Sequence, residues 1–404
     1  MNNKALELIN YTRQLLASML FRDIYKTSPQ YFTRESPLNF SNTALLILKM
    51  IKKSIKVELM NYFEDFNNKL EIPTRQAFSQ AREKISYLAF KDFFDKSCEL
   101  ALDSDGAITY KGFRLFAIDG TSFLVGPLQK LCEYFGDTTT VAGQAMCRIN
   151  GVVDVLNDVI VHAEVSPFCI GERALAINQV KALKSITEII YLFDRGYWSP
   201  ELVSAIVENG QNFVMRLAKN VGQTIAKDAE GNNLNLRRYS FVLPCGTEET
   251  LLTNLSADEV SNEELASLYA KRWGAETKYL QLKERLQINK FSSESVNSVL
   301  QDIYSTLYIS NLVAFICFEA DEIIKEKTDN KDNKYEQKAN RSVCIAALRD
   351  RFVKICTSNS LLSGLALQKL CKDISKEVIY INKSKSRPRR KNRFITSKSK
   401  NIFY

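Results

Sequence analysis

Two stretches decide the fold: Phe113-Arg-Leu-Phe-Ala-Ile-Asp119 and Glu188-Ile-Ile-Tyr-Leu-Phe-Asp194. Each is a largely apolar run that ends on an aspartate, which is typical of a buried strand. In open sheets, ligands gather beyond the strand ends, where side chains leave the core. We therefore predict that both aspartates lie at strand ends, although Asp119-Gly120 is also a turn signal. Likewise, Asp194-Arg195 could be only a salt-bridged strand end.

The surrounding segments predict an α/β protein. Three strands precede an alternation of helix and strand, an order that favours a mixed sheet flanked by helices. His162 lies in the alternating stretch 159–165 and is interpreted as a strand residue; the alternative, a catalytic histidine, would need convergent partners. The further strands and helices that we expect are strands over 146–155, 159–165 and 213–217, and helices over 172–183 and from Ser199-Pro200.

A long helix expected from about Ser261 carries a row of functional side chains. With 100° per residue, Tyr269, Arg272, Glu276 and Lys283 fall within an arc of roughly 60°. A neighbouring apolar stripe would pack this helix on a sheet and leave the row at the edge of the sheet. The glutamate could then complete an oxygen cage for a divalent ion while the cations hold phosphates without pairing to it. The alternative is a solvated helix face with a chance ion pair. The apolar stripe consists of Leu268, Ala275, Tyr279, Leu282 and Leu286.

The regions on either side of this core are mostly helical. Helices are expected over Asn3–Phe21, over Asn39–Phe63 with Ser41 and Asn42 as caps, and after Pro73-Thr74 over 75–84. The basic segment 75–84 fits either a DNA contact or the solvated face of a helical bundle. Further along the chain we expect polar strands over 221–255, a helix over Ser295–Lys325, a polar loop over 326–340 and one or two short helices.

The charge of the 404-residue chain is unevenly distributed. The net charge is +9, but residues 383–404 contain nine basic residues and no acid, so residues 1–382 are neutral. Such a tail suits a polyanion, or else it is a solvated extension. Nine cysteines without a Cys-x2-Cys pair and a single histidine argue against a zinc ribbon. No signal-peptide core and no apolar run of ~20 residues are found, so we expect a cytoplasmic, nucleoid-associated protein without a membrane partner.

The spacing Tyr-x2-Arg-x3-Glu-x6-Lys resembles the signature of the insertion-sequence-four group of DDE transposases. Asp119 in Ile-Asp-Gly-Thr and Asp194 in Phe-Asp-Arg-Gly-Tyr are similar to the first and second aspartates of that family. The resemblance covers about residues 75–320 and implies a ribonuclease H-like core interrupted by a β-rich insertion. Gly274 departs from the family, whose members often carry a bulkier residue there, and it should cost the helix about 1 kcal/mol relative to alanine.

The resemblance implies a metal-dependent enzyme that acts on DNA. Asp119, Asp194 and Glu276 would be the catalytic residues and would bind two Mg²⁺ ions, with Mn²⁺ as a substitute. The partners would be double-stranded DNA, as transposon ends and target, and a second copy of the chain in a homodimeric DNA complex. The alternatives are a ribonuclease H-like nuclease without strand transfer and a domesticated DNA-binding derivative. The residues expected to contact DNA are Tyr269, Arg272, Lys283, Arg195, Arg389, Arg390 and Lys391.

These predictions divide the chain into six parts. The core is split by the insertion, and helical regions lie on both sides of it. The predicted parts are an N-terminal helical region for recognition of DNA ends (1–108), the first part of the core (109–220), a β-rich insertion (221–258), the core completion with the catalytic helix (259–326), a C-terminal helical region (327–382) and the basic tail (383–404).

Overall fold

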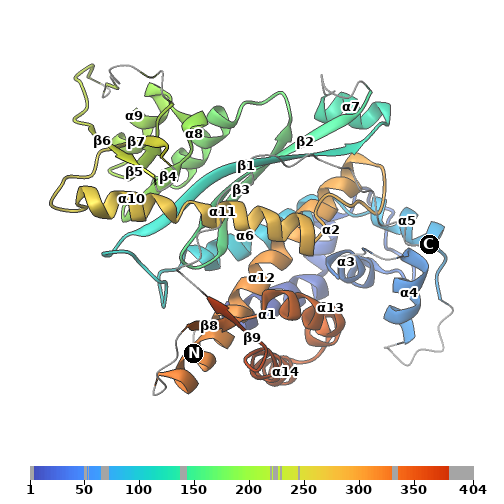
Figure 1. Ribbon diagram of the computed structural model, residues 1–404. Coiled ribbons are helices and arrows are strands. Elements are labelled where there is room, and N and C mark those ends of the chain that lie inside the picture. The colour runs from blue at the N-terminus through green and yellow to red at the C-terminus, as the bar shows by residue number, and fades with distance from the viewer. Residues whose placement is uncertain are drawn as a thin grey trace.

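A mixed sheet of seven strands forms the centre of the protein (Figure 1). The strand order is β3-β2-β1-β4-β5-β7-β6; β1, β4 and β5 are parallel to one another, and every other pair is antiparallel. The prediction of an α/β fold with a mixed sheet flanked by helices is confirmed. The strands are β1 (Arg114–Gly126), β2 (Ala145–Asp154), β3 (Val159–Pro167), β4 (Ile189–Phe193), β5 (Asn212–Arg216), β6 (Arg237–Val242) and β7 (Glu248–Thr253).

The computed structural model describes most of the chain. The basic tail, with Arg389, Arg390 and Lys391, lies outside the described residues. Within the described part, no helix is long and apolar enough to cross a membrane. The described residues are 4–49, 52, 54–64, 72–136, 143–218, 221, 226–227, 230–243, 246–329 and 335–381.

Helices cover both faces of the sheet. An added Cβ at Gly120 would meet Glu172 of α8, whereas one at Gly151 would meet Tyr279 of α11. Gly151 of β2 pairs with Asp119, the residue before Gly120 in β1. Successive residues of a strand point to opposite faces, so positions 120 and 151 lie on opposite faces of the sheet. The helices that pack on the sheet are α6 (Leu88–Leu102), α7 (Gln129–Phe135), α8 (Glu172–Ala182), α9 (Pro200–Glu208), α10 (Asn262–Ala270) and α11 (Trp273–Leu280), which continues into the π-helical turn η2 (Gln281–Arg285).

The remaining helices gather around α12, as Figure 1 shows. Every residue of α12 from Ser298 to Cys317 is buried, which is typical of a central helix. The Asn311 side chain accepts a hydrogen bond from the N–H of Ile160 (2.9 Å) and donates one to its carbonyl (2.8 Å). Two backbone groups of the edge strand β3 are thus hydrogen-bonded. α12 spans Val296–Thr328. The remaining elements that pack on it are α1 (Lys4–Ala17), α3 (Phe40–Leu48), α5 (Arg75–Glu83), α13 (Arg341–Thr357), α14 (Ser360–Ile374) and β8 (Glu336–Ala339), which pairs with β9 (Val378–Ile381). α2 (Met19–Tyr25) contacts α1, and α4 (Ile55–Glu64) contacts α3 and α5.

Several helix boundaries differ from the predictions. The first predicted helix is divided into α1 and α2, because the Ser18 side chain accepts the N–H of Phe21 and starts a new helix. The second is divided into α3 and α4, and its cap is Asn39, not Ser41 or Asn42. β8 lies in the segment predicted as a loop, while β6 and β7 extend the main sheet from the segment predicted to be strand-rich.

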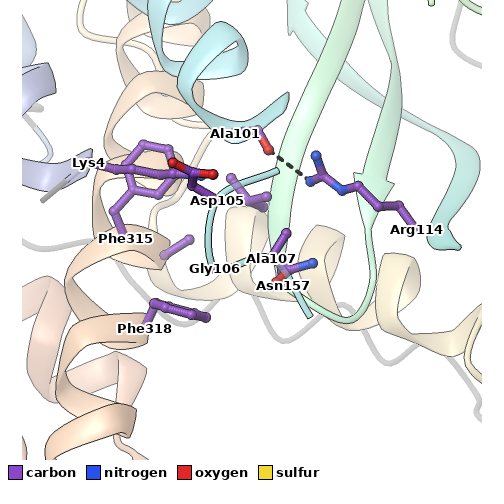
Figure 2. Close-up of a pocket in the computed structure, with 11 residues that line it drawn as sticks. Lys4, Ala101, Asp105, Gly106, Ala107, Arg114, Asn157, Phe315 and Phe318 are labelled. Atoms are coloured by element: carbon purple, nitrogen blue, oxygen red, sulfur yellow. Dashed lines mark hydrogen bonds between the residues drawn. The ribbon is translucent and has the colours of Figure 1, made fainter. Parts of the chain in front are cut away.

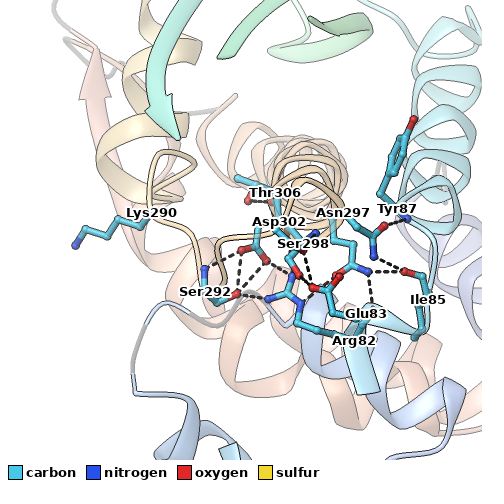
Figure 3. A network of polar contacts seen from close by, with 12 residues as sticks. Arg82, Glu83, Ile85, Tyr87, Lys290, Ser292, Asn297, Ser298, Asp302 and Thr306 are labelled. Atoms are coloured by element: carbon cyan, nitrogen blue, oxygen red, sulfur yellow. Dashed lines mark hydrogen bonds and ion pairs between the residues drawn. The ribbon is translucent and has the colours of Figure 1, made fainter. Parts of the chain in front are cut away.

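A buried polar network joins α5 to the start of α12 (Figure 3). Arg82 is 1% exposed and donates to Asp302 (2.9 Å) and Gln301 (3.0 Å). Its neighbour Glu83 accepts the hydroxyl of Ser295 (2.6 Å). This part of the basic segment 75–84 therefore faces the helical bundle, so Arg82 is not available to DNA.

Replacing Arg82 with methionine should lower the free energy of unfolding by about 3–5 kcal/mol, because Asp302 would lose its buried counter-ion. Urea denaturation measures this change. Arg75→Ala, an exposed arginine on the same helix, is the control and should change stability by no more than about 0.5 kcal/mol. Equal effects of the two substitutions would contradict a stabilising role for the network.

Candidate active site

Asp119 and Asp194 lie at the same level on neighbouring parallel strands. β1 and β4 pair as far as Ala117 opposite Leu192, and each aspartate lies two residues beyond this pair. Asp194 follows β4 directly, as predicted. Asp119 instead lies inside β1, because the antiparallel strand β2 continues to pair past the end of β4, with Gly151 opposite Asp119. The prediction of a strand end at Asp119 is therefore wrong.

The third acid, Glu276, is carried by an irregular helix. α10 begins with a capping box, in which the Ser261 side chain and Glu264 bond each other's backbone N–H. Around Lys271 the chain is tightened, since Gly274 N–H donates to the Lys271 carbonyl (2.9 Å), three residues back. It then widens into the π-helical turn η2. The regular projection of 100° per residue therefore does not hold along the whole segment.

The prediction for one face of this segment is confirmed, and the prediction for the other face is wrong in part. The apolar stripe is buried, as predicted. In the predicted edge row, however, Tyr269 is only 5% and Arg272 only 3% exposed, whereas Glu276 and Lys283 are partly exposed. Because a three-residue turn advances by about 120° per residue, the tightened stretch departs from the regular projection, and half of the row lies inside.

Arg272 connects the helix to the sheet. Its guanidinium donates to Glu276 Oε1 (2.6 Å) and lies 3.7 Å from Asp119 Oδ2. Its charge also lies over the rings of Tyr269 (5.9 Å) and Trp273 (5.4 Å). The prediction that Arg272 does not pair with Glu276 is therefore wrong: one buried cation bridges two of the three candidate acids.

Asp194 has its own arginine, which the sequence analysis did not single out. Arg216, at the end of β5, donates to Asp194 Oδ1 from Nη2 (2.5 Å) and Nε (2.9 Å) and to Glu249 (2.8 Å). β4 and β5 pair up to Phe193 opposite Met215, so Arg216 is level with Asp194. The single basic residue near the end of the apolar run 213–217 was the available signal.

The two aspartates differ in acidity. Burial raises the pKa of Asp119 to about 6, although the Gly120 N–H and Arg272 act in the opposite direction. Burial also acts to raise the pKa of Asp194, but the N–H of the next residue and Arg216 outweigh it, so that pKa lies below its ordinary value. Environments that separate the pKa values of paired carboxyl groups are common at catalytic sites.

Two other predicted cations lie near the acids with fewer contacts. Lys283 is partly exposed, and no hydrogen bond or ion pair of its ammonium with another described residue is found. Burial lowers the pKa of Lys283, while the charge of Asp119 acts to raise it. Arg195 is exposed, and its backbone N–H donates to Asp194 Oδ1 (2.7 Å). Lys283 therefore interacts electrostatically with Asp119, although no ion pair between the two described residues is found.

The candidate acids supply only carboxylate oxygens, which hard divalent cations prefer. In this arrangement each of the three acids lies against an arginine, Asp119 and Glu276 against Arg272 and Asp194 against Arg216. Within the described part of the chain, no group of three His, Cys, Asp or Glu residues is placed to hold a metal ion. The chemistry of the donor set fits a divalent ion, whereas the present positions of the side chains fit the arginines.

A small cavity elsewhere in the molecule is separate from these acids (Figure 2). It has a volume of about 40 Å³ and lies between α1, the end of α6 and α12, with Lys4, Asp105 and Phe315 in its wall. Arg114 in the same wall donates to the carbonyl of Ala101 (2.8 Å). The cavity belongs to the joint between helices and sheet.

His162, the alternative catalytic residue, lies within β3, where burial lowers its pKa.

The three candidate acids thus come from separate elements: two aspartates lie at one level of the sheet, and a glutamate lies on a helix that packs on it. The model of the family described as "Transposase DDE domain" matches residues 110–312, half of the chain. The chain belongs to this family. The match includes all three candidate acids.

Known transposases are among the proteins that resemble the chain. Putative transposase InsZ of Escherichia coli (strain K12) is 24% identical over 165 residues, which are 39% of this chain and 53% of that protein. The chain therefore spans about half the length of this curated relative. The cryo-EM structure of a piggyBac transposase synaptic complex with hairpin DNA has 11% identity and a TM-score of 0.48, and covers 93% of this chain and 82% of that one.

Without divalent metal, Asp119 should make stability depend on pH between about pH 4 and pH 6. Its pKa is about 6 in the folded protein against the ordinary value of 3.8, so the folded state binds more protons in this window. Unfolding free energy therefore falls as pH rises through the window, by at most about 3 kcal/mol. Asp119→Asn should remove this component, which thermal unfolding in EDTA from pH 4 to pH 7 measures.

Glu263→Gln, a substitution on α10 away from the acids, serves as the control for this measurement and should keep the pH dependence of the wild type. A stability difference between wild type and Asp119→Asn that stays constant from pH 4 to pH 7 would contradict the raised pKa.

Proposed function

We propose that the protein is a DNA transposase of the insertion-sequence-four group, which cuts and rejoins DNA strands in cut-and-paste transposition. The observation that carries this proposal is the bridge that Arg272 makes between Asp119 on the sheet and Glu276 on the helix, within the part of the chain matched by the transposase family. It supports a site in which acids from separate elements act together.

Asp119, Asp194 and Glu276 would hold two Mg²⁺ ions, with Mn²⁺ as a substitute. When bound, these ions would lower the pKa of the attacking water or DNA 3′-hydroxyl and stabilise the leaving oxygen. The carboxylates of this chain would hold these ions, and the arginines that pair with the carboxylates now would be released toward phosphate oxygens. Arg272 presents a planar fork that suits a phosphate as well as a carboxylate.

Contacts with DNA would come from several parts of the chain. Lys283 would hold a phosphate of the cleaved transposon end, beside Tyr269 and Arg272. We also propose that region 1–108 recognises DNA ends and that the tail 383–404 adds salt-sensitive affinity without sequence preference. The active complex would be a homodimer on double-stranded DNA.

Asp119→Asn, Asp194→Asn and Glu276→Gln should each abolish Mg²⁺-dependent cutting of a duplex that carries the inverted repeats flanking the gene. Binding of the duplex should remain, because the carboxylates are proposed to bind metal ions, whereas the cationic side chains bind the DNA phosphates. Gel assays of cleavage, binding and joining to a target plasmid measure the three steps.

Glu263→Gln serves again as the control and should cut normally. Robust cutting by one of the acid variants would remove that residue from the site. Cutting by the wild type without joining to the plasmid would identify a nuclease instead of a transposase.

Lys283→Ala should weaken formation of the end complex by about 1–3 kcal/mol, as loss of a charge-assisted bond to phosphate does. Its stability should barely change, since no ion pair of Lys283 is found among the described residues. Lys271→Ala, an exposed lysine at the end of α10, removes the same charge and should bind ends almost normally.

Arg272→Ala should differ from Lys283→Ala by losing stability as well as end binding, because Arg272 is buried between the acids. Thermal unfolding and titration with a pre-nicked duplex separate the two effects. Normal end binding by Lys283→Ala would exclude the proposed phosphate contact.

A further inference from the structure

The catalytic helix is seated on the turn between β2 and β3. At Gly274 in α11, an added Cβ would lie 2.9 Å from Cβ and 3.1 Å from Cγ1 of Val155, which follows β2. No real Cβ contact is that close, so a larger residue would push the helix away from the turn. This close approach gives a physical reason for the glycine two residues before Glu276.

Lys278, two residues after Glu276, contacts the same turn. Its side chain is 1% exposed, and its ammonium donates to the backbone carbonyl of Asp158 (2.7 Å) and lies 3.5 Å from the Asp158 carboxylate. Asp158 has a positive φ of 51°, a left-handed conformation that aspartate adopts in tight turns. Lys278 thus links α11 to the turn that contains Asp158.

Asp158 is also held by a C-terminal helix. Arg341, the first residue of α13, donates to the Asp158 carboxylate. Asp321 of α12, which accepts the N–H of Ala339 (2.6 Å), adds a second negative charge near Arg341. Two cations and two acids therefore balance, and the turn is fixed between α11 and α13.

A third contact fixes α11 on the sheet beside the first aspartate. The hydroxyl of Tyr279 donates to the backbone carbonyl of Asp119 (2.5 Å) and lies over Gly151, where an added Cβ would be 2.8 Å from it. Residues 274, 278 and 279 thus hold α11 on both sides of Glu276.

We propose that Lys278 is a positioning residue for Glu276: with Gly274, it seats α11 on the turn at residues 155–158 and so fixes the distance of the glutamate from Asp119. This inference rests on the proposed function, because it assigns Lys278 a role in presenting Glu276 to a divalent ion. Lys278 itself is buried and reaches neither the ion nor DNA.

The test compares Lys278→Met and Lys278→Arg with Arg82→Met, which removes a buried cation of equal charge from the distant α5 network. Amide hydrogen exchange across 273–281 is measured without metal, and Mn²⁺ affinity is measured by calorimetry without DNA, below the unfolding temperature of every variant. Lys278→Met should speed exchange in α11 and weaken Mn²⁺ binding by about tenfold or more, as loss of a supporting residue does.

Lys278→Arg should restore most of both properties, whereas Arg82→Met should lower thermal stability and leave both unchanged. Wild-type exchange and Mn²⁺ affinity in Lys278→Met, or equal changes in Arg82→Met, would overturn the inference. If Glu276→Gln binds Mn²⁺ as tightly as the wild type, the metal role of Glu276 fails instead, and the exchange measurement still decides whether Lys278 seats the helix.

Discussion

The guanidinium of Arg272 between Asp119 and Glu276 is the interaction on which the candidate site depends. Two carboxylates brought together in a partly buried place repel each other strongly unless a positive charge lies between them. Arg272 supplies that charge from the same helix as Glu276, so the helix and the sheet are joined where the acids meet. Asp194 is balanced separately by Arg216, from the next strand of the sheet. The three acids are therefore divided between two arginines, one from the helix and one from the sheet.

Much of this arrangement could be predicted from local patterns. Alternation and apolar runs predicted the five core strands, because side-chain periodicity follows directly from burial on one or both faces. Thr74, Ser199 and Ser295 cap the helices that begin where polar residues precede apolar series. Asp194 follows its strand as expected. These features depend on neighbours in the sequence, so the sequence alone contains them.

The features that the sequence did not predict correctly depend on contacts between segments that are distant in the sequence. β1 continues through Asp119 because Gly151 of β2, 32 residues further along the sequence, pairs with it beyond the end of β4. Arg272 is buried because the helix tightens around Lys271 and turns it toward the sheet. The pairing of Arg216 with Asp194 became recognisable only from the parallel register of β4 and β5. Gly274, which propensity alone marks as a cost of about 1 kcal/mol, is explained by the closeness of Val155.

The central position of α12 has a consequence for the time course of folding on the ribosome. Arg82 of α5 and its partner Asp302 of α12 are 220 residues apart. With synthesis at ~5–20 residues per second, the N-terminal helices wait roughly 10–40 s for the helix that buries them. During that interval the faces of α3 and α5 that pack on α12 are uncovered, so they are surfaces that a holding chaperone would bind. The nascent chain should thus be most prone to aggregation between completion of α5 and emergence of α12.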